Sequence, residues 1–78
     1  MAKLKCPFCD VSAEGAFRLK KHLMGRRDYG GHEIPEYQAD IIVRMQNGEE
    51  LSDEENELVE ETIENVKGNN GVYREENT

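Results

Sequence analysis

The sequence CPFCDVSAEGAFRLKKHLMGRRDYGGH, which runs from Cys6 to His32, decides how this chain folds. It contains both cysteines and both histidines of the 78 residues. Two residues separate the cysteines, twelve lie between Cys9 and His22, and nine lie between the histidines. Two cysteines with two histidines form a closed tetrahedral ligand set for zinc. The sequence therefore predicts one structural Zn²⁺ ion held by Cys6, Cys9, His22 and His32.

The spacing of the histidines is wider than usual for such a site. Nine residues separate them, against the usual separation of roughly three to five. We interpret His32 as a displaced ligand that returns to the metal because Gly30 and Gly31 allow a sharp reversal. Three alternatives stay open at this point: a redox-active Cys-x2-Cys pair, a Cys6–Cys9 disulfide, and a site completed by Glu33 or water.

Length and composition favour a single small domain. A core of this size contributes only about 3–5 kcal/mol, so a metal that crosslinks the chain is physically sensible. Hydrophobic residues make up 36% of the sequence and tryptophan is absent. No apolar run is long enough for a signal peptide or a membrane helix. We therefore expect an intracellular protein in a reducing compartment (cytoplasm, or nucleus in a eukaryote), with no membrane partner.

Charge is distributed unevenly along the chain, which has a formal net charge of −7. Residues 1–32 carry seven basic and three acidic side chains, a net charge of +4. Residues 33–78 carry three basic and fourteen acidic side chains, a net charge of −11. This split between a basic metal-binding part and an acidic part is more informative than the total charge.

Residues 1–36 have the pattern of a metal-stabilised strand, turn and helix. Residues 3–5 alternate polar and apolar, which predicts a short strand, and Pro7 favours a tight turn between the cysteines. A helix is expected from Ala16 to Met24, ending at Gly25. Phe17, Leu19, Leu23 and Met24 would supply its apolar surface.

Two further helices are expected after this region. Pro35 suits the first turn of a helix over residues 35–46, with Gly48 past its end. The apolar positions of this helix would be Ile34, Tyr37, Ile41, Ile42 and Met45. A strand over residues 41–43 is the alternative, because two isoleucines and a valine in succession favour strands.

The next helix has a clear start signal. Ser52 with Glu55 predicts a capping box, and the helix should continue to about Lys67 and stop at Gly68. Its glutamate-rich surface is interpreted mainly as a solvated face. Residues 69–78 are expected to be frayed or disordered.

The predicted fold class is thus small α+β. A zinc-stabilised β-knuckle and helix (1–36) precede an acidic helical hairpin (37–67) and a flexible tail (68–78). We expect the hairpin to close through four apolar residues and to lean on two from the first helix. These are Ile41, Met45, Leu58 and Ile63 in the hairpin, and Phe17 and Leu23 in the first helix.

The metal-binding region resembles the two-Cys two-His zinc fingers, in which a leucine usually lies three residues before the first histidine, as Leu19 does here. The finger aromatic four residues after the second cysteine is replaced by Ala13. Residues 4–36 are more similar to BED-type fingers of transposase-related and chromatin-associated proteins. The motif there resembles Gly15-Ala16-Phe17-Arg18-Leu19-Lys20-Lys21-His22-Leu23, with a looped-out last ligand and a nearby proline, here Pro35. The aromatic residues often found before the cysteine pair are absent.

This resemblance implies DNA binding and a regulatory role, with RNA as another nucleic acid that the same surface could contact. In a finger, the helix that carries the first histidine enters the major groove. Counting back from His22 places Lys21 and Arg18 where bases are read, and the other basic side chains would contact phosphates. The predicted nucleic-acid contacts are Arg18, Lys20, Lys21, Arg26, Arg27, Lys3 and Lys5.

A second interpretation belongs to another class: a zinc-stabilised protein-interaction adaptor that does not bind nucleic acid. The acidic part weakens attraction to DNA. Residues 37–67 could instead dock on a protein partner or pair with a second copy of the chain. An enzyme is not expected, because four protein ligands leave zinc no open coordination position.

Overall fold

The computed structural model describes residues 3–74 and shows a small α+β fold: a two-stranded antiparallel hairpin followed by three α-helices. The hairpin pairs β1 (Leu4–Lys5) with β2 (Ser12–Ala13). The helices are α1 (Ala16–Met24), α2 (Glu36–Gln46) and α3 (Asp53–Gly68), and a short 3₁₀ helix, η1 (Arg27–Tyr29), lies between α1 and α2. This agrees with the predicted fold class.

The hairpin and α1 form because the cysteine turn is short and the helix is amphipathic. The backbone N–H of Cys6 donates to the carbonyl of Val11, which closes the turn at 2.9 Å. Leu19 and Leu23 lie one helical turn apart and are fully buried, so they fix the face that α1 turns to the core. The helix ends at Gly25, as the sequence predicts.

Residues 41–43 are helical, so the strand alternative for this segment is wrong. Pro35 is the N-cap of α2, so the helix begins at Glu36, one residue after the predicted start. Ile41, Ile42 and Val43 are all buried, because α2 is covered from more than one side. Burial among neighbouring elements outweighs the preference of these residues for strands.

Helix α3 begins at the predicted capping box. The Glu55 backbone N–H donates to Ser52 Oγ, and the Ser52 backbone N–H donates to Glu55 Oε1. Arg44 of α2 donates to the other Glu55 oxygen at 2.9 Å, which ties the start of α3 to α2. Because of these interactions, chiefly the bond from the Ser52 N–H, the pKa of Glu55 is lowered.

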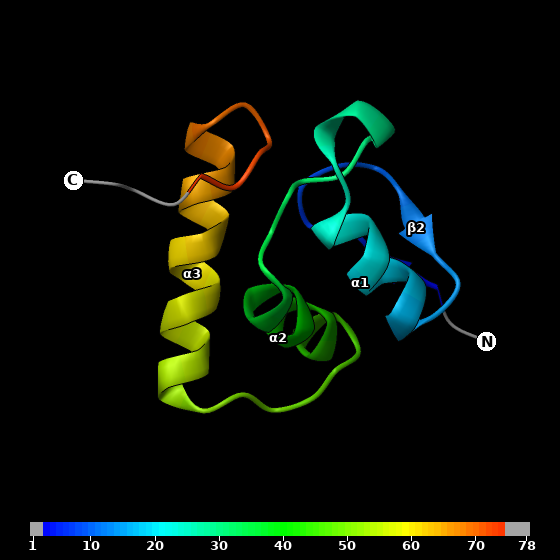
Figure 1. The fold of residues 1–78 in the computed structure, drawn as a ribbon. Coiled ribbons are helices and arrows are strands. Elements are labelled where there is room, and N and C mark those ends of the chain that lie inside the picture. The colour runs from blue at the N-terminus through cyan, green and yellow to red at the C-terminus, as the bar shows by residue number, and fades with distance from the viewer. Residues whose placement is uncertain (1–2, 75–78) are drawn as a thin grey trace.

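Helix α2 lies between α1 and α3 (Figure 1), and within residues 3–74 α3 packs on α2 and not on α1. The first described residues lie on the side of α1, and the last described residues lie on the side of α3 (Figure 1). One core runs through all three layers, with α3 contributing Val59, Thr62 and Val66 as its buried residues. The predicted helical hairpin is thus present.

Two details of the predicted packing are wrong. Phe17 does not support the hairpin, because 70% of this residue is exposed, and Leu23 alone of the two expected α1 contacts is buried. Tyr37, expected in the apolar stripe of α2, is 66% exposed. Both residues lie beside the buried stripe of their helix, where an amphipathic pattern does not separate the edge from the centre.

The segment after α3 also differs from the expectation of a frayed tail. Val72 is buried, and the Tyr73 backbone N–H donates to the carbonyl of His32 at 2.8 Å. Residues 71–73 therefore pack against His32; residues 75–78 lie outside the described part of the chain. None of the helices described over residues 3–74 is long and apolar enough to cross a membrane.

Candidate metal centre

The four predicted ligands meet in one place although they come from three different parts of the fold. Cys6 and Cys9 lie in the turn between β1 and β2, His22 lies on the last turn of α1, and His32 follows η1. Their sulfur and ring-nitrogen atoms all lie within 4.8 Å of one another. The residues are therefore positioned to hold one metal ion, consistent with a single structural Zn²⁺ ion.

The distances between ligand atoms fit a tetrahedral zinc site. Cys6 Sγ lies 3.3 Å from His32 Nε2, and Cys9 Sγ lies 3.4 Å from His22 Nε2. In a tetrahedron with Zn–S near 2.3 Å and Zn–N near 2.0–2.1 Å, a sulfur and a nitrogen are about 3.5 Å apart. Two thiolates also balance the charge of a divalent ion. The donor set and these two sulfur–nitrogen distances thus suit zinc.

His32 reaches the site because two glycines reverse the chain. Gly30 has φ of 82°, a left-handed conformation that glycine adopts without strain. Gly31 passes so close to Gly25 that a Cβ atom at this position would overlap the Gly25 carbonyl. The loop is therefore folded tightly onto the end of α1, which brings His32 next to His22 in spite of the long spacing.

The orientation of His32 is set by the segment after α3. Its Nδ1 lies 2.7 Å from the carbonyl oxygen of Gly71. Because a carbonyl only accepts, Nδ1 must carry the proton, which leaves the Nε2 lone pair free to face Cys6 Sγ. The sequence did not reveal Gly71 and Tyr73 as neighbours of the site, because Gly71 lies 39 positions after His32 and no local pattern links them.

Burial shifts the protonation of two ligands. It raises the pKa of the Cys6 thiol to about 11, against a smaller opposite effect from the backbone N–H of Phe8. It lowers the pKa of His22, and the nearby His32 lowers it further. The neutral imidazole can accept a cation directly, whereas the buried thiol must first lose its proton to the arriving metal.

Two of the alternatives left open by the sequence, a Cys6–Cys9 disulfide and completion of the site by Glu33, are not seen in the structure. Cys6 and Cys9 are free thiols. Glu33 is exposed, and its carboxylate accepts from the Arg27 backbone N–H at 3.2 Å instead of joining the four ligand atoms. Phe8 covers the centre, with its ring centroid 5.1 Å from that of His32.

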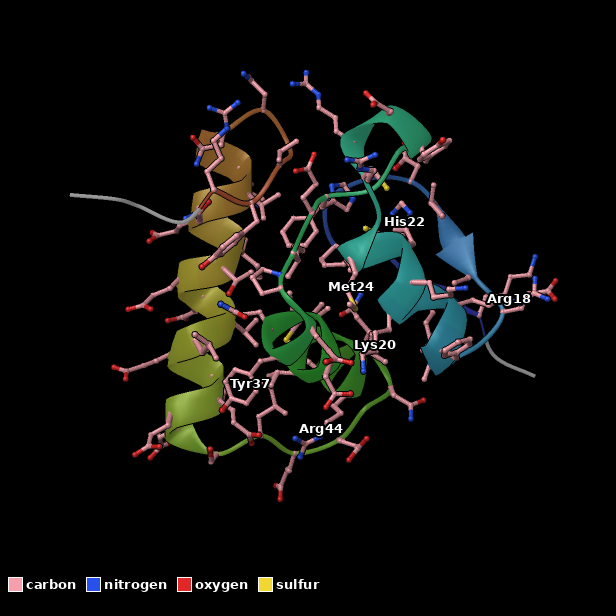
Figure 2. The ribbon with its side chains drawn as sticks, viewed as in Figure 1. Arg18, Lys20, His22, Met24, Tyr37 and Arg44 are labelled. Carbon is pink, nitrogen blue, oxygen red and sulfur yellow. The ribbon has the colours of Figure 1, made fainter. Side chains whose placement is uncertain are left out.

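The structure does not gather the predicted nucleic-acid contacts into a single cluster. All seven except Lys20 are exposed. Figure 2 shows Arg18 directed away from α2 and α3, whereas Lys20 points toward α2. There Lys20 forms ion pairs with Glu36 at 3.4 Å and Asp40 at 4.0 Å. Arg18 and Lys21 have no such partner among residues 3–74.

Lys21 has a different neighbour on α1. Its Nζ lies 5.5 Å from the centroid of the exposed Phe17 ring, a separation within the range of cation–π contacts. Residues 17 and 21 are four apart and therefore share one side of the helix. The exposed side of α1 thus combines basic and aromatic groups.

Comparison of the chain with models of protein families, with curated proteins and with solved structures found no match. The arrangement of Cys6, Cys9, His22 and His32 is consistent with a two-Cys two-His finger, and that likeness stands on the motif and the geometry alone.

Proposed function

We propose that this chain is a zinc-finger nucleic-acid-binding protein with duplex DNA as its target and with regulation as its role. The observation that carries the proposal is the free basic surface of α1. Arg18 and Lys21 are exposed, and among residues 3–74 neither forms an ion pair. These are the positions at which a finger helix reads bases, and the BED-type resemblance of residues 4–36 supports the same assignment.

The layered fold supports this proposal in spite of the negative net charge. Helix α3 carries seven acidic residues and one lysine, and α2 separates it from α1. Packed helices lie roughly 8–10 Å apart, so charges on α3 are farther from α1 than the ~8 Å Debye length at physiological salt. The acidic surface of α3 therefore weakens the long-range attraction between the protein and DNA more than it weakens the contacts that α1 makes with DNA at close range.

The contacts have unequal roles in this proposal. Arg18 and Lys21 would reach base edges or phosphates in the major groove, and Arg26, Arg27, Lys3 and Lys5 would contact phosphates. Lys20 contributes least, because Glu36 and Asp40 already neutralise it. The zinc would stabilise the finger without catalysing a reaction, since all four of its positions would be filled by protein ligands.

The second candidate is the protein-interaction adaptor. The observation that favours it is the exposure of three aromatic residues, Phe17, Tyr29 and Tyr37, which protein interfaces favour. A homodimer or a protein partner through residues 37–67 stays a prediction. The apolar stripes of α2 and α3 already face each other, so such an interface would have to use their outer sides.

The test is fluorescence anisotropy of the zinc-loaded chain with labelled random duplex DNA, and with duplex RNA in parallel. Affinity should fall steeply between about 50 and about 200 mM salt, with a logarithmic slope of about −0.9 for each phosphate contact. Replacing Arg18 and Lys21 together by Ala should weaken DNA binding at least tenfold, which is about 1.4 kcal/mol.

The matched control replaces two basic residues on the side of α3, Lys67 and Arg74, by Ala. It removes the same charge far from α1 and should change DNA affinity much less. Equal losses in both double variants would mean that the attraction is not local to α1. No binding at any salt concentration would reject the nucleic-acid proposal and favour the adaptor.

A further inference from the structure

We propose that the segment Gly71–Tyr73, which follows α3, is part of the metal centre and positions the displaced ligand His32. This inference concerns zinc binding and is independent of the proposed contact with DNA. It implies that the last turn of the acidic helix is a required support of the site.

Two hydrogen bonds place this segment on His32, and a buried side chain lies between them. The Gly71 carbonyl accepts from Nδ1 at 2.7 Å, so it fixes both the tautomer and the plane of the imidazole. The Tyr73 backbone N–H donates to the His32 carbonyl at 2.8 Å. Between them the side chain of Val72 is buried, with 6% of the residue exposed. The ligand is therefore held through its ring and through its backbone.

The way in which α3 ends explains why the segment turns back toward His32. The Gly71 N–H donates to the Val66 carbonyl at 2.9 Å, and Asn70 adopts a left-handed conformation with φ of 58°. This is the bonding of a Schellman-type helix end. Gly71 itself has φ of 87°. This conformation directs its carbonyl toward His32, and β-branched residues strongly disfavour it.

Hydrogen bonds on the side away from the ligands hold the segment in place. Asn65 of α3 accepts from the Arg74 N–H at 2.8 Å and donates to the Arg74 carbonyl at 2.6 Å. Gln38 of α2 donates to the Tyr73 hydroxyl at 3.3 Å. The acceptor for His32 is thus anchored to both later helices and is not a chance contact of a loose chain end.

The hydrogen bond between His32 and the Gly71 carbonyl matters because of the chemistry of zinc ligation. A metal-bound histidine normally donates its second ring N–H to a carboxylate, a carbonyl or water, and loss of that acceptor typically costs about 10–100-fold in metal affinity. His32 needs such support because it lies on a loop outside the helix that carries His22. The Gly71 carbonyl supplies it.

The test compares Gly71→Val with Gly48→Val in the full chain. Gly48 follows α2 and is a close match in backbone conformation, with φ of 88° against 87° at Gly71. At both positions no atom lies within 4 Å of an added Cβ. Both variants force a β-branched side chain into the same disfavoured conformation, but only Gly71 contacts a ligand. Zinc affinity is measured by competition with a chelating indicator.

Gly71→Val should bind zinc about tenfold or more weakly than Gly48→Val. A second measurement separates positioning from general loss of stability. In the zinc-loaded wild type, NMR should show the His32 Nδ1 proton as a slowly exchanging signal, and Gly71→Val should lose that signal while zinc stays bound. Equal zinc affinities of the two variants, or an unchanged Nδ1 proton in Gly71→Val, would overturn the proposal.

Discussion

Gly31 is the residue that most directly allows His32 to approach the other three ligands. A Cβ atom at this position would overlap the Gly25 carbonyl, which is backbone and cannot rotate away. The glycine pair is visible in the sequence and suggests a reversal. The close approach to Gly25 is a tertiary fact that no local pattern contains.

Replacing Gly31 by Ala should therefore open the loop and weaken zinc binding at least tenfold, equivalent to about 1.4 kcal/mol. Gly68→Ala is the control, because nothing lies within 4 Å of a Cβ there and the residue belongs to α3. The measurement is zinc competition with a chelating indicator. If both variants bound zinc as the wild type does, the tight loop would not be needed to bring His32 to the metal.

The protonation of Cys6 makes a second prediction at the scale of single residues. In the folded site without an ion, burial raises the pKa of Cys6 to about 11, and even an unfolded thiol, with a pKa of about 8.5, is mostly protonated at neutral pH, so zinc must displace a proton from it. A ligand that is protonated before binding makes apparent affinity rise with pH, by about tenfold per pH unit for each proton displaced. The pKa of His22 is lowered, so above neutral pH a proton competes little with zinc for this ring.

Zinc affinity should accordingly increase from about pH 7 to about pH 8, since the Cys6 thiol is protonated over this range whether the metal-free chain is folded or unfolded. Competition titrations at several pH values measure the slope. An affinity that is flat over the range would show that the thiol is already ionised before the metal arrives.

Individual elements follow the sequence where their signals are local. Helix α1 has its predicted bounds because Leu19 and Leu23 set its buried face and Gly25 ends it. Helix α3 starts at Ser52 because the capping box needs only residues 52–55. Capping and stop signals involve only residues close together in the sequence, so they can be recognised before the fold is known.

Other features depended on contacts between distant parts of the chain and could not be predicted. Residues 71–73 have a polar, glycine-containing neighbourhood that is typical of a frayed end, yet Val72 enters the core. What holds them is the carbonyl and ring of His32, far away in sequence. The exposure of Phe17 was missed for a similar reason, because α2 covers a different side of α1.

The capping box makes a prediction at the scale of elements. Ser52→Ala removes the acceptor for the Glu55 N–H and should lower the free energy of unfolding by about 1 kcal/mol. Chemical unfolding of the zinc-loaded protein measures this. Ser12→Ala, an exposed position in β2, is the control and should change stability little. An equal effect of the two substitutions would show that the Ser52 cap does not stabilise the protein.

At the scale of the whole molecule, the order of the layers decides how the acidic helix acts on a bound polyanion. Helix α3 is separated from α1 by α2 (Figure 1), so its charges act through solvent and across the fold. Their reach is set by the Debye length, about 30 Å at 0.01 M salt and about 8 Å at physiological ionic strength.

Replacing Glu57, Glu60 and Glu64 together by Gln should therefore raise DNA affinity at low salt and leave it almost unchanged at physiological salt. These exposed residues lie on α3, so the change leaves the ligands and the segment after α3 intact. Anisotropy titrations at both salt concentrations test it. A gain of the same size under both conditions would mean that α3 blocks DNA by direct contact instead.

The central claim is that one zinc ion, held by Cys6, Cys9, His22 and His32, stabilises this fold. A small core contributes little alone, whereas structural zinc contributes on the order of 10 kcal/mol in finger-sized domains. The most direct test is a zinc titration of metal-free protein followed by two-dimensional ¹H–¹⁵N NMR. We predict that dispersed signals appear up to one equivalent of zinc and disappear with a chelator. Full dispersion in the metal-free protein would contradict the claim.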